Sequence, residues 1–150
     1  MLAASLVALA ISPAFAASPC HVHGPLPDAR CTPGAVFPSA TSARVCRAGY
    51  TRRVRNVPDR VKALVYRRYG VSRHSRATYE MDHLIPLELG GSNKQKNLFP
   101  QAAKPFPGFH EKDTLENTLH ALVCDGRMPL RQAQRLIAEN WVKSYDALVR

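Results

Sequence analysis

The chain has 150 residues, 45% of them hydrophobic, which excludes a disordered polyelectrolyte and supports one domain with a buried core. The formal net charge of +10 is uneven: residues 30–76 hold twelve Lys and Arg against one acid, whereas residues 77–150 hold nine of each. Such a local excess of cations indicates a polyanionic partner, and the alternatives are a generally cationic surface or attraction to an anionic membrane.

The N-terminus has the pattern of a signal peptide. Residues 1–16 contain no charged side chain, are apolar from Leu2 to Ile11, and end in Ala14-Phe15-Ala16, a small-x-small cleavage pattern. We expect their removal, which would leave a secreted or periplasmic protein that is not membrane-bound. The alternative is a buried N-terminal helix, because the run is too short for a bilayer anchor.

The next segment, residues 17–45, is rich in proline and lacks amphipathic periodicity, so we expect an irregular chain held by cysteines. An even cysteine count in an exported chain predicts two disulfides. Their spacing contains no C-x-x-C pair, which argues against a structural zinc site. Three pairings are open among Cys20, Cys31, Cys46 and Cys124.

A basic helix is expected next. Val61, Leu64 and Val65 follow a 3.6-residue period after Pro58, and Gly70 supplies the stop. The polar faces of this helix and the segment before it can lie on a phosphate backbone. The arginines expected to make these contacts are Arg52, Arg53, Arg55, Arg60, Arg67 and Arg68.

The second half of the chain predicts two strands followed by two helices, an α+β fold. Residues 78–84 alternate with period 2, residues 90–93 form a glycine-rich turn, and residues 97–99 are interpreted as the return strand. Apolar stripes then predict a helix from residue 110 or 111 to 124 and a longer one over residues 130–148.

The pair Asp82-His83 falls at the end of the first expected strand. Neighbouring strand residues point to opposite faces. A metal ligand on one face and a general base on the other would suit in-line attack at phosphorus. The simpler alternatives are an aspartate that begins a turn and a structural histidine.

The segment Asp82-His83-Leu84-Ile85-Pro86-Leu87, with Gly90-Gly91 and Asn97-Leu98, resembles the HNH endonuclease family, whose fold is a ββα-metal finger. Together with Asn97-Leu98-Phe99-Pro100-Gln101 and Leu119-His120-x-x-Val123-Cys124 it is similar to small exported bacterial HNH proteins, over roughly residues 31–145. The resemblance implies an HNH domain over residues 46–150, with additional packed helices and a disulfide-tied N-terminal segment.

The resemblance also implies roles for individual residues. Asp82 and His110 would bind the metal, and His83 would be the general base. Asn97 would hold the loop that orients His83, or reach the metal, or only cap a turn. His110 is otherwise a residue of the helix N-terminus. Lys112 would contact a phosphate, and its alternative is a solvated lysine in the first helical turn.

The expected cofactor is one divalent ion, Mg²⁺, with Mn²⁺ or Zn²⁺ as alternatives, because a carboxylate and an imidazole accept all three. The implied function is hydrolysis of DNA with low sequence specificity, RNA being the alternative substrate. The main rival is a secreted cationic protein that binds DNA or an anionic surface without cutting. No protein partner follows from the sequence.

Overall fold

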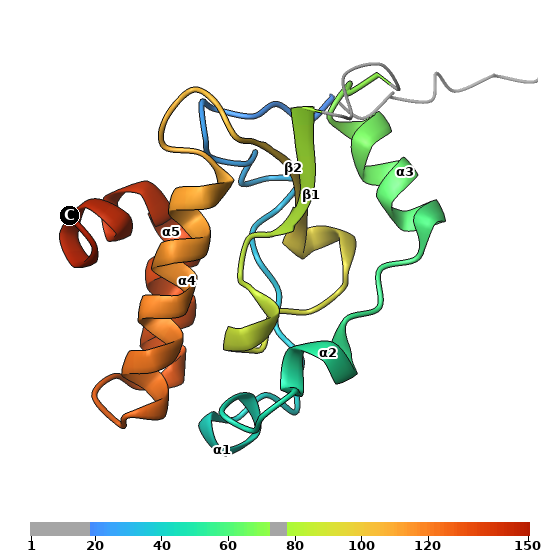
Figure 1. Ribbon diagram of the computed structural model, residues 1–150. Helices are drawn as coiled ribbons and strands as arrows, with labels where there is room; N and C mark the ends of the chain where they lie inside the picture. Colours follow the sequence, from blue (N-terminus) through green and yellow to red (C-terminus); the bar gives the residue numbers. More distant parts are fainter. Residues whose placement is uncertain (1–18, 73–77) are drawn as a thin grey trace, which may run out of the picture.

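The computed structural model describes residues 19–72 and 78–150, so the expected signal peptide lies outside the described residues. The protein is α+β: two strands lie between α3 on one side and the pair α4 and α5 on the other (Figure 1). The elements are α1 Ser42–Val45, α2 Tyr50–Val54, α3 Asp59–Arg68, β1 Tyr79–His83, β2 Leu98–Ala102, α4 Phe109–Cys124 and α5 Leu130–Leu148, with short 3-10 turns at Leu87–Leu89 and Gln95–Asn97.

The sheet is one antiparallel pair. In β1 and β2, Tyr79 lies opposite Ala102 and His83 lies opposite Leu98. The predicted strand over residues 78–84 is therefore confirmed, and the return strand starts and ends later than the expected residues 97–99. His83 is the last residue of β1, so its side chain lies where the chain leaves the sheet.

The turn between the strands depends on the glycine pair. Gly90 has φ +80°, and a Cβ there would lie 2.4 Å from the Ala40 side chain. A Cβ on Gly91 would lie 1.7 Å from the carbonyl oxygen of Ile85, closer than any contact allows. The pair therefore permits both a left-handed turn and a close backbone approach beside the end of β1.

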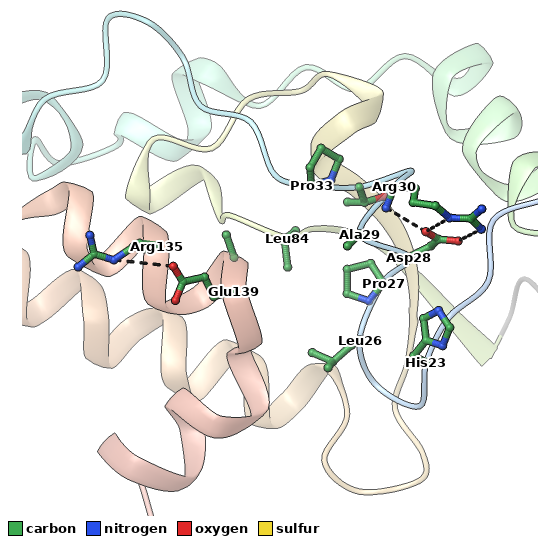
Figure 2. A pocket seen from close by; sticks show the side chains of 12 residues that line it. His23, Leu26, Pro27, Asp28, Ala29, Arg30, Pro33, Leu84, Arg135 and Glu139 are labelled. Carbon is green, nitrogen blue, oxygen red and sulfur yellow. Dashed lines mark hydrogen bonds and ion pairs between the residues drawn. The ribbon is translucent and has the colours of Figure 1, made fainter.

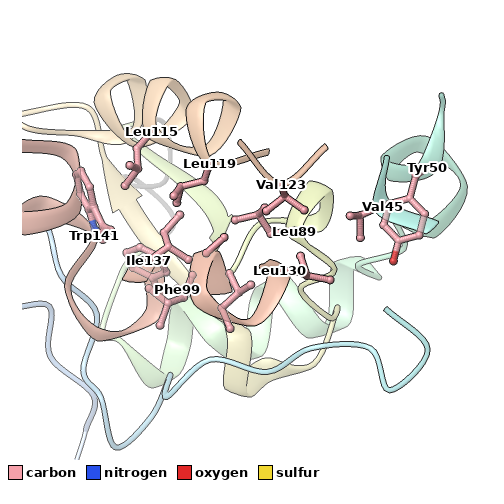
Figure 3. Packing of buried hydrophobic residues seen from close by; sticks show 13 residues of the cluster. Val45, Tyr50, Leu89, Phe99, Leu115, Leu119, Val123, Leu130, Ile137 and Trp141 are labelled. Atoms are coloured by element: carbon pink, nitrogen blue, oxygen red, sulfur yellow. The ribbon is translucent and has the colours of Figure 1, made fainter. Parts of the chain in front are cut away.

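The core lies between the sheet and the two long helices (Figure 3). Leu115 and Leu119 of α4 and Ile137 and Trp141 of α5 are fully buried with Phe99 of β2. Their spacing of four residues puts each pair on one helix face, which is why the sequence stripes predicted these helices.

Helix α5 is broken at Asn140, a difference from the predicted continuous helix. Asn140 has φ −166° and ψ 91°, and its Oδ1 accepts a hydrogen bond from the Lys143 backbone N–H at 3.0 Å. An asparagine side chain that caps the following turn competes with the helical ladder, so the apolar stripe continues while the helix restarts.

The N-terminal segment is irregular, as expected, up to the start of α1. Trp141 Nε1 donates to the carbonyl oxygen of Pro25 at 3.2 Å, which fixes this segment to α5. Helices α1 and α2 were not predicted, because four or five residues are too few for a periodic pattern.

The disulfides are Cys20–Cys31 and Cys46–Cys124. The first closes a local loop in the N-terminal segment, and the second ties the end of α1 to the end of α4. Two disulfides indicate an oxidising, extracellular type of environment. None of the helices within residues 19–72 and 78–150 is long and apolar enough to span a bilayer.

The two disulfides should differ in how much they stabilise the fold. Their separations of 11 and 78 residues correspond, on the chain-entropy model, to about 2.8 and about 4.5 kcal/mol. Replacing Cys46 and Cys124 by Ser should therefore lower the free energy of unfolding more than the same change at Cys20 and Cys31. Urea unfolding of the two double variants measures this, and the reverse order would contradict it.

Candidate functional site

His83 is a nearly buried residue, 4% exposed, and its ring is held by Asn93. The ring Nε2 and Asn93 Oδ1 are 3.0 Å apart, while Asn93 Nδ2 donates to the carbonyl oxygen of Val54 at 2.7 Å. Because the amide nitrogen is used by Val54, the amide oxygen faces the ring and accepts from Nε2–H. This network leaves Nδ1 as the proton acceptor of a neutral imidazole.

The electrostatic surroundings keep His83 neutral. Burial lowers the pKa of His83 below its ordinary value, and the hydrogen bond to Asn93 opposes this only in part. The charge of Asp82 acts in the same direction as Asn93, whereas Arg55 and Lys112 lower the pKa further. A neutral imidazole with one unprotonated ring nitrogen can accept a proton near neutral pH.

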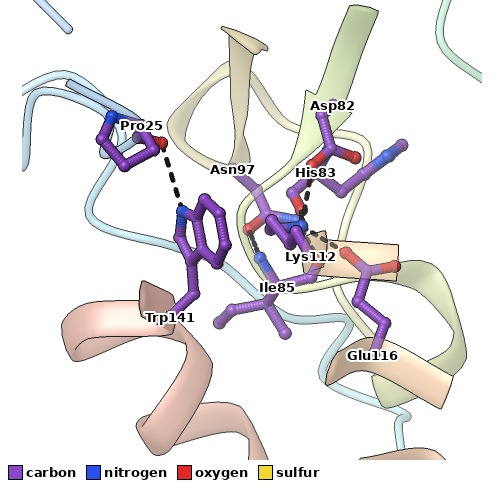
Figure 4. A network of polar contacts seen from close by, with 8 residues as sticks. All are labelled: Pro25, Asp82, His83, Ile85, Asn97, Lys112, Glu116 and Trp141. Carbon is purple, nitrogen blue, oxygen red and sulfur yellow. Dashed lines mark hydrogen bonds and ion pairs between the residues drawn. The ribbon is translucent and has the colours of Figure 1, made fainter. Parts of the chain in front are cut away.

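Asn97 is fully buried and holds the loop after β1 (Figure 4). Its Oδ1 accepts from the backbone N–H groups of Ile85 at 3.0 Å and Ala35 at 3.3 Å. Its Nδ2 donates to the carbonyl oxygens of Ile85 at 2.8 Å and Ser92 at 3.0 Å. With all four bonds made to backbone, the Asn97 amide holds the chain beside His83 and has no group left for a metal.

Lys112 lies in the interior, which corrects its expected contact with a phosphate. Its Nζ donates to Asp82 Oδ2 at 2.7 Å, to the His83 carbonyl oxygen at 2.8 Å, and to Glu116 Oε1 (Figure 4). Lys112 lies in the first turn of α4, and its side chain points inward to the end of β1. Burial alone would lower the pKa of Lys112, but the charges of Asp82 and Glu116 outweigh it and raise the pKa.

Asp82 is the partly exposed partner of the buried Lys112. Its Oδ1 accepts from the His83 backbone N–H at 2.7 Å, its Oδ2 accepts from Lys112, and its side chain is 21% exposed. Lys112 and Asp82 therefore bind both backbone polar groups of His83. Burial raises the pKa of Glu116, the second carboxylate on the lysine, and the Lys112 charge opposes that rise.

Further ionisable side chains surround Asp82. Burial raises the pKa values of Glu80 and Asp113, and the charge of Asp82 raises both further, while His110 lowers both. His110 is exposed at the start of α4, with its ring against that of Phe109. The face that carries Asp82 thus also carries carboxylates and an imidazole, and the joint binding of a metal by Asp82 and His110 stays a prediction.

A different group, Cys46, His120 and Cys124, has three donor atoms within 4.8 Å of one another, a spacing that could hold a metal ion. The two sulfurs are bonded to each other, however, and metals bind the thiolate. This group is therefore a ligand set only in its reduced form. In the disulfide form the His120 Nε2 lies 3.2 Å from the carbonyl oxygen of Val45.

The expected phosphate-binding arginines lie along α2 and α3. Arg55 lies in the link between these helices, and its charge lowers the pKa values of both His83 and Glu80. Arg68 is half-buried at the end of α3. The other predicted arginines are exposed: Arg52, Arg53, Arg60 and Arg67.

A hollow of about 620 Å³ between the N-terminal segment and α5 is separate from these residues (Figure 2). Its lining includes Leu26, Leu84 and the ion pairs Arg30–Asp28 and Arg135–Glu139. It contains none of Asp82, His83 and Asn97. Its size alone therefore does not make it the functional site.

Comparison with known proteins identifies no relative: no family model, curated protein or solved structure matches the chain. The site is therefore interpreted from its own geometry.

The sequence interpretation missed the parts played by Asn93 and Glu116. From the sequence, Asn93 was placed only in the turn. Its position at the end of a glycine-rich turn, ten residues after a histidine at a strand end, could have indicated a contact with that histidine. Glu116 lies four residues after Lys112 and four residues before His120, and both spacings allow a side-chain pair on a helix. Choosing between those partners requires knowing which face of α4 is buried.

The His83 ring should titrate below its ordinary pKa of 6.5 in the absence of divalent ions. Asn93→Ala removes the acceptor that raises this pKa, so it should lower the value further. Asn93→Asp keeps the acceptor and adds a negative charge, so it should raise the value. Proton NMR of the ring across a pH series measures all three, and a wild-type value above 6.5 would contradict the assigned surroundings.

Lys112→Met should destabilise the protein by roughly 3–5 kcal/mol, the usual cost of removing one partner of a buried ion pair. The loss arises because Asp82 and Glu116 are left facing each other without a cation. Adding Glu116→Leu removes a buried carboxyl group that has lost its partner and should recover part of the loss. Denaturant unfolding measures both variants, and a cost of Lys112→Met below about 1 kcal/mol would be inconsistent with the buried network.

Proposed function

We propose that the protein is an exported, metal-dependent endonuclease of the HNH type that hydrolyses DNA phosphodiester bonds with low sequence specificity. The observation that carries this proposal is the arrangement of His83. A neutral imidazole at the end of β1 is oriented by Asn93, with Asp82 beside it on the strand. The order β1, glycine turn, β2, α4 is also that of a ββα-metal finger.

In this proposal His83 is the general base. Its Nδ1 accepts a proton from a water molecule as the water oxygen attacks phosphorus, and the bond from phosphorus to the leaving oxygen breaks. The Nε2–H bond to Asn93 keeps the ring in the tautomer that this step needs. Lys112 and Asp82 act as positioning residues, since they bind the carbonyl and the N–H of His83.

The side chains near Asp82 are of the kinds that bind a hard divalent ion, carboxylate and imidazole. Asp82 and His110 would hold it, and Glu80 and Asp113 add carboxylates whose mutual repulsion a cation would relieve. Among the described residues, no three of these donors converge as the Cys46 group does, so water or phosphate oxygens would complete the coordination. When bound, the ion would neutralise charge on the phosphate oxygens.

The basic surface supports nucleic acid as substrate. Arg55 lies close enough to His83 to lower its pKa, and exposed arginines of α2 and α3 continue from there. Contacts of this kind are made to phosphates and carry little sequence information, so cleavage should be largely non-specific. The two disulfides and the signal-like N-terminus support export.

A second candidate is a cationic protein that binds nucleic acid without cutting it. Two observations favour it: the residue His83 is only 4% exposed, and Asp82 is already paired with the buried ammonium of Lys112. A plasmid assay separates the two candidates, since both bind DNA and only the enzyme breaks it.

The wild type should nick plasmid DNA with Mg²⁺, and His83→Ala should lower that rate at least about 10²-fold, the scale of a lost general base. DNA binding should be nearly unchanged. His23→Ala removes an exposed imidazole outside the site and is the matched control. Excess chelator should stop cleavage and Mg²⁺ should restore it.

Each result in this assay decides one part of the proposal. Equal rates for the wild type and His83→Ala would remove His83 from the mechanism. Cleavage that persists in excess chelator would remove the metal. A wild type that binds DNA and never nicks it would establish the non-catalytic candidate.

A further inference from the structure

A basic groove lies between α3 and the loop that leads into β2. It has a volume of about 500 Å³, and its lining includes Arg30, Arg68, Lys94 and Lys96. No acidic residue is among the described side chains that line it. Lys94 and Lys96 belong to the half of the sequence with no net charge, so the groove joins cations that the chain keeps far apart.

The Arg30 guanidinium is held in a fixed position at the groove. Asp28 accepts from Arg30 Nε at 3.2 Å and from Nη2 at 3.0 Å. The Asp28 side chain is 3% exposed, whereas that of Arg30 is 69% exposed. A buried carboxylate thus anchors one edge of the guanidinium while the rest faces solvent, so a ligand meets a side chain that has already lost most of its rotamer freedom.

Other bonds fix the walls of the groove to one another. The Cys20–Cys31 disulfide holds the residue after Arg30, and the Cys20 N–H donates to the Arg68 carbonyl oxygen at 3.0 Å. Arg68 Nη1 in turn donates to Gln95 Oε1 at 3.4 Å, across to the loop. Three segments distant in sequence are therefore linked around one cationic hollow.

The groove reaches the candidate site through Asn93. This residue lines the groove, and its amide oxygen accepts from His83 Nε2. We infer that the groove binds the phosphates of one nucleic-acid strand and leads that strand to His83. The inference rests on the proposed function for its choice of ligand.

The dimensions and chemistry of the groove select this ligand. Its volume is in the range of small-ligand pockets, which suits the backbone of one strand. The ammonium groups of Lys94 and Lys96 and the Arg68 guanidinium suit a run of phosphates, and the edge of the Arg30 guanidinium that Asp28 leaves free adds a further donor.

The test compares two triple variants for binding a labelled single-stranded DNA of about 20 nucleotides, in excess chelator. The groove variant is Arg68→Gln, Lys94→Gln and Lys96→Gln. The matched control removes the same charge from exposed positions near and on α5: Arg127→Gln, Arg131→Gln and Lys143→Gln. Circular dichroism and thermal unfolding establish that both variants keep the fold.

If the groove variant loses three phosphate contacts, its slope of log affinity against log salt should become less steep by about 2, at roughly 0.7 per contact for a single strand. At about 0.1 M salt the same rule gives an affinity about 10²-fold lower. The control variant should change the slope by less than about 1. Equal losses in the two variants, or no loss in the groove variant, would overturn the groove assignment.

The groove proposal and the nuclease proposal can be rejected independently of each other. A wild type that cuts no plasmid, together with a groove variant that loses affinity, would reject the enzyme and keep the groove. A groove variant that binds like the wild type would reject the groove, whatever the plasmid assay gives.

Discussion

The buried ammonium of Lys112 is the interaction on which the site depends. It has no solvent contact, yet it binds two carboxylates, from Asp82 and Glu116, and the carbonyl oxygen of His83. Removing an ion from water costs several kcal/mol, which only a well-formed set of partners can offset. The first turn of α4 must therefore sit against the end of β1, and this contact sets the position of His83.

Much of the fold follows from local patterns in the sequence. The period-2 run over residues 78–84 predicted β1, and the apolar stripes predicted α3 and α4 to within a residue or two at each end. The cysteine pairing was not predictable, because it depends on which segments meet in space. The break at Asn140 was also missed, since the apolar stripe of α5 continues across it while the backbone turns.

The site residues that lie together in one short sequence motif were predictable. Asp82, His83 and Asn97 were singled out together, and the structure brings them to the same end of the sheet. The buried position of Lys112 was not predicted, because the packing of the whole helix decides whether a lysine in its first turn faces solvent or the interior. The basic groove was missed for a similar reason: its cations come from three separate segments.

The amide of Asn93 links the wall of the groove to the His83 ring. One oxygen fixes the tautomer of the His83 ring, while the same side chain forms part of the groove wall and is tied to α2 through the carbonyl of Val54. A strand that shifts this wall also shifts the orientation of the imidazole. If the groove binds a nucleic-acid strand and His83 is the general base, as proposed, an occupied groove and an empty one would differ in the reactivity of His83, so substrate length would affect turnover as well as affinity.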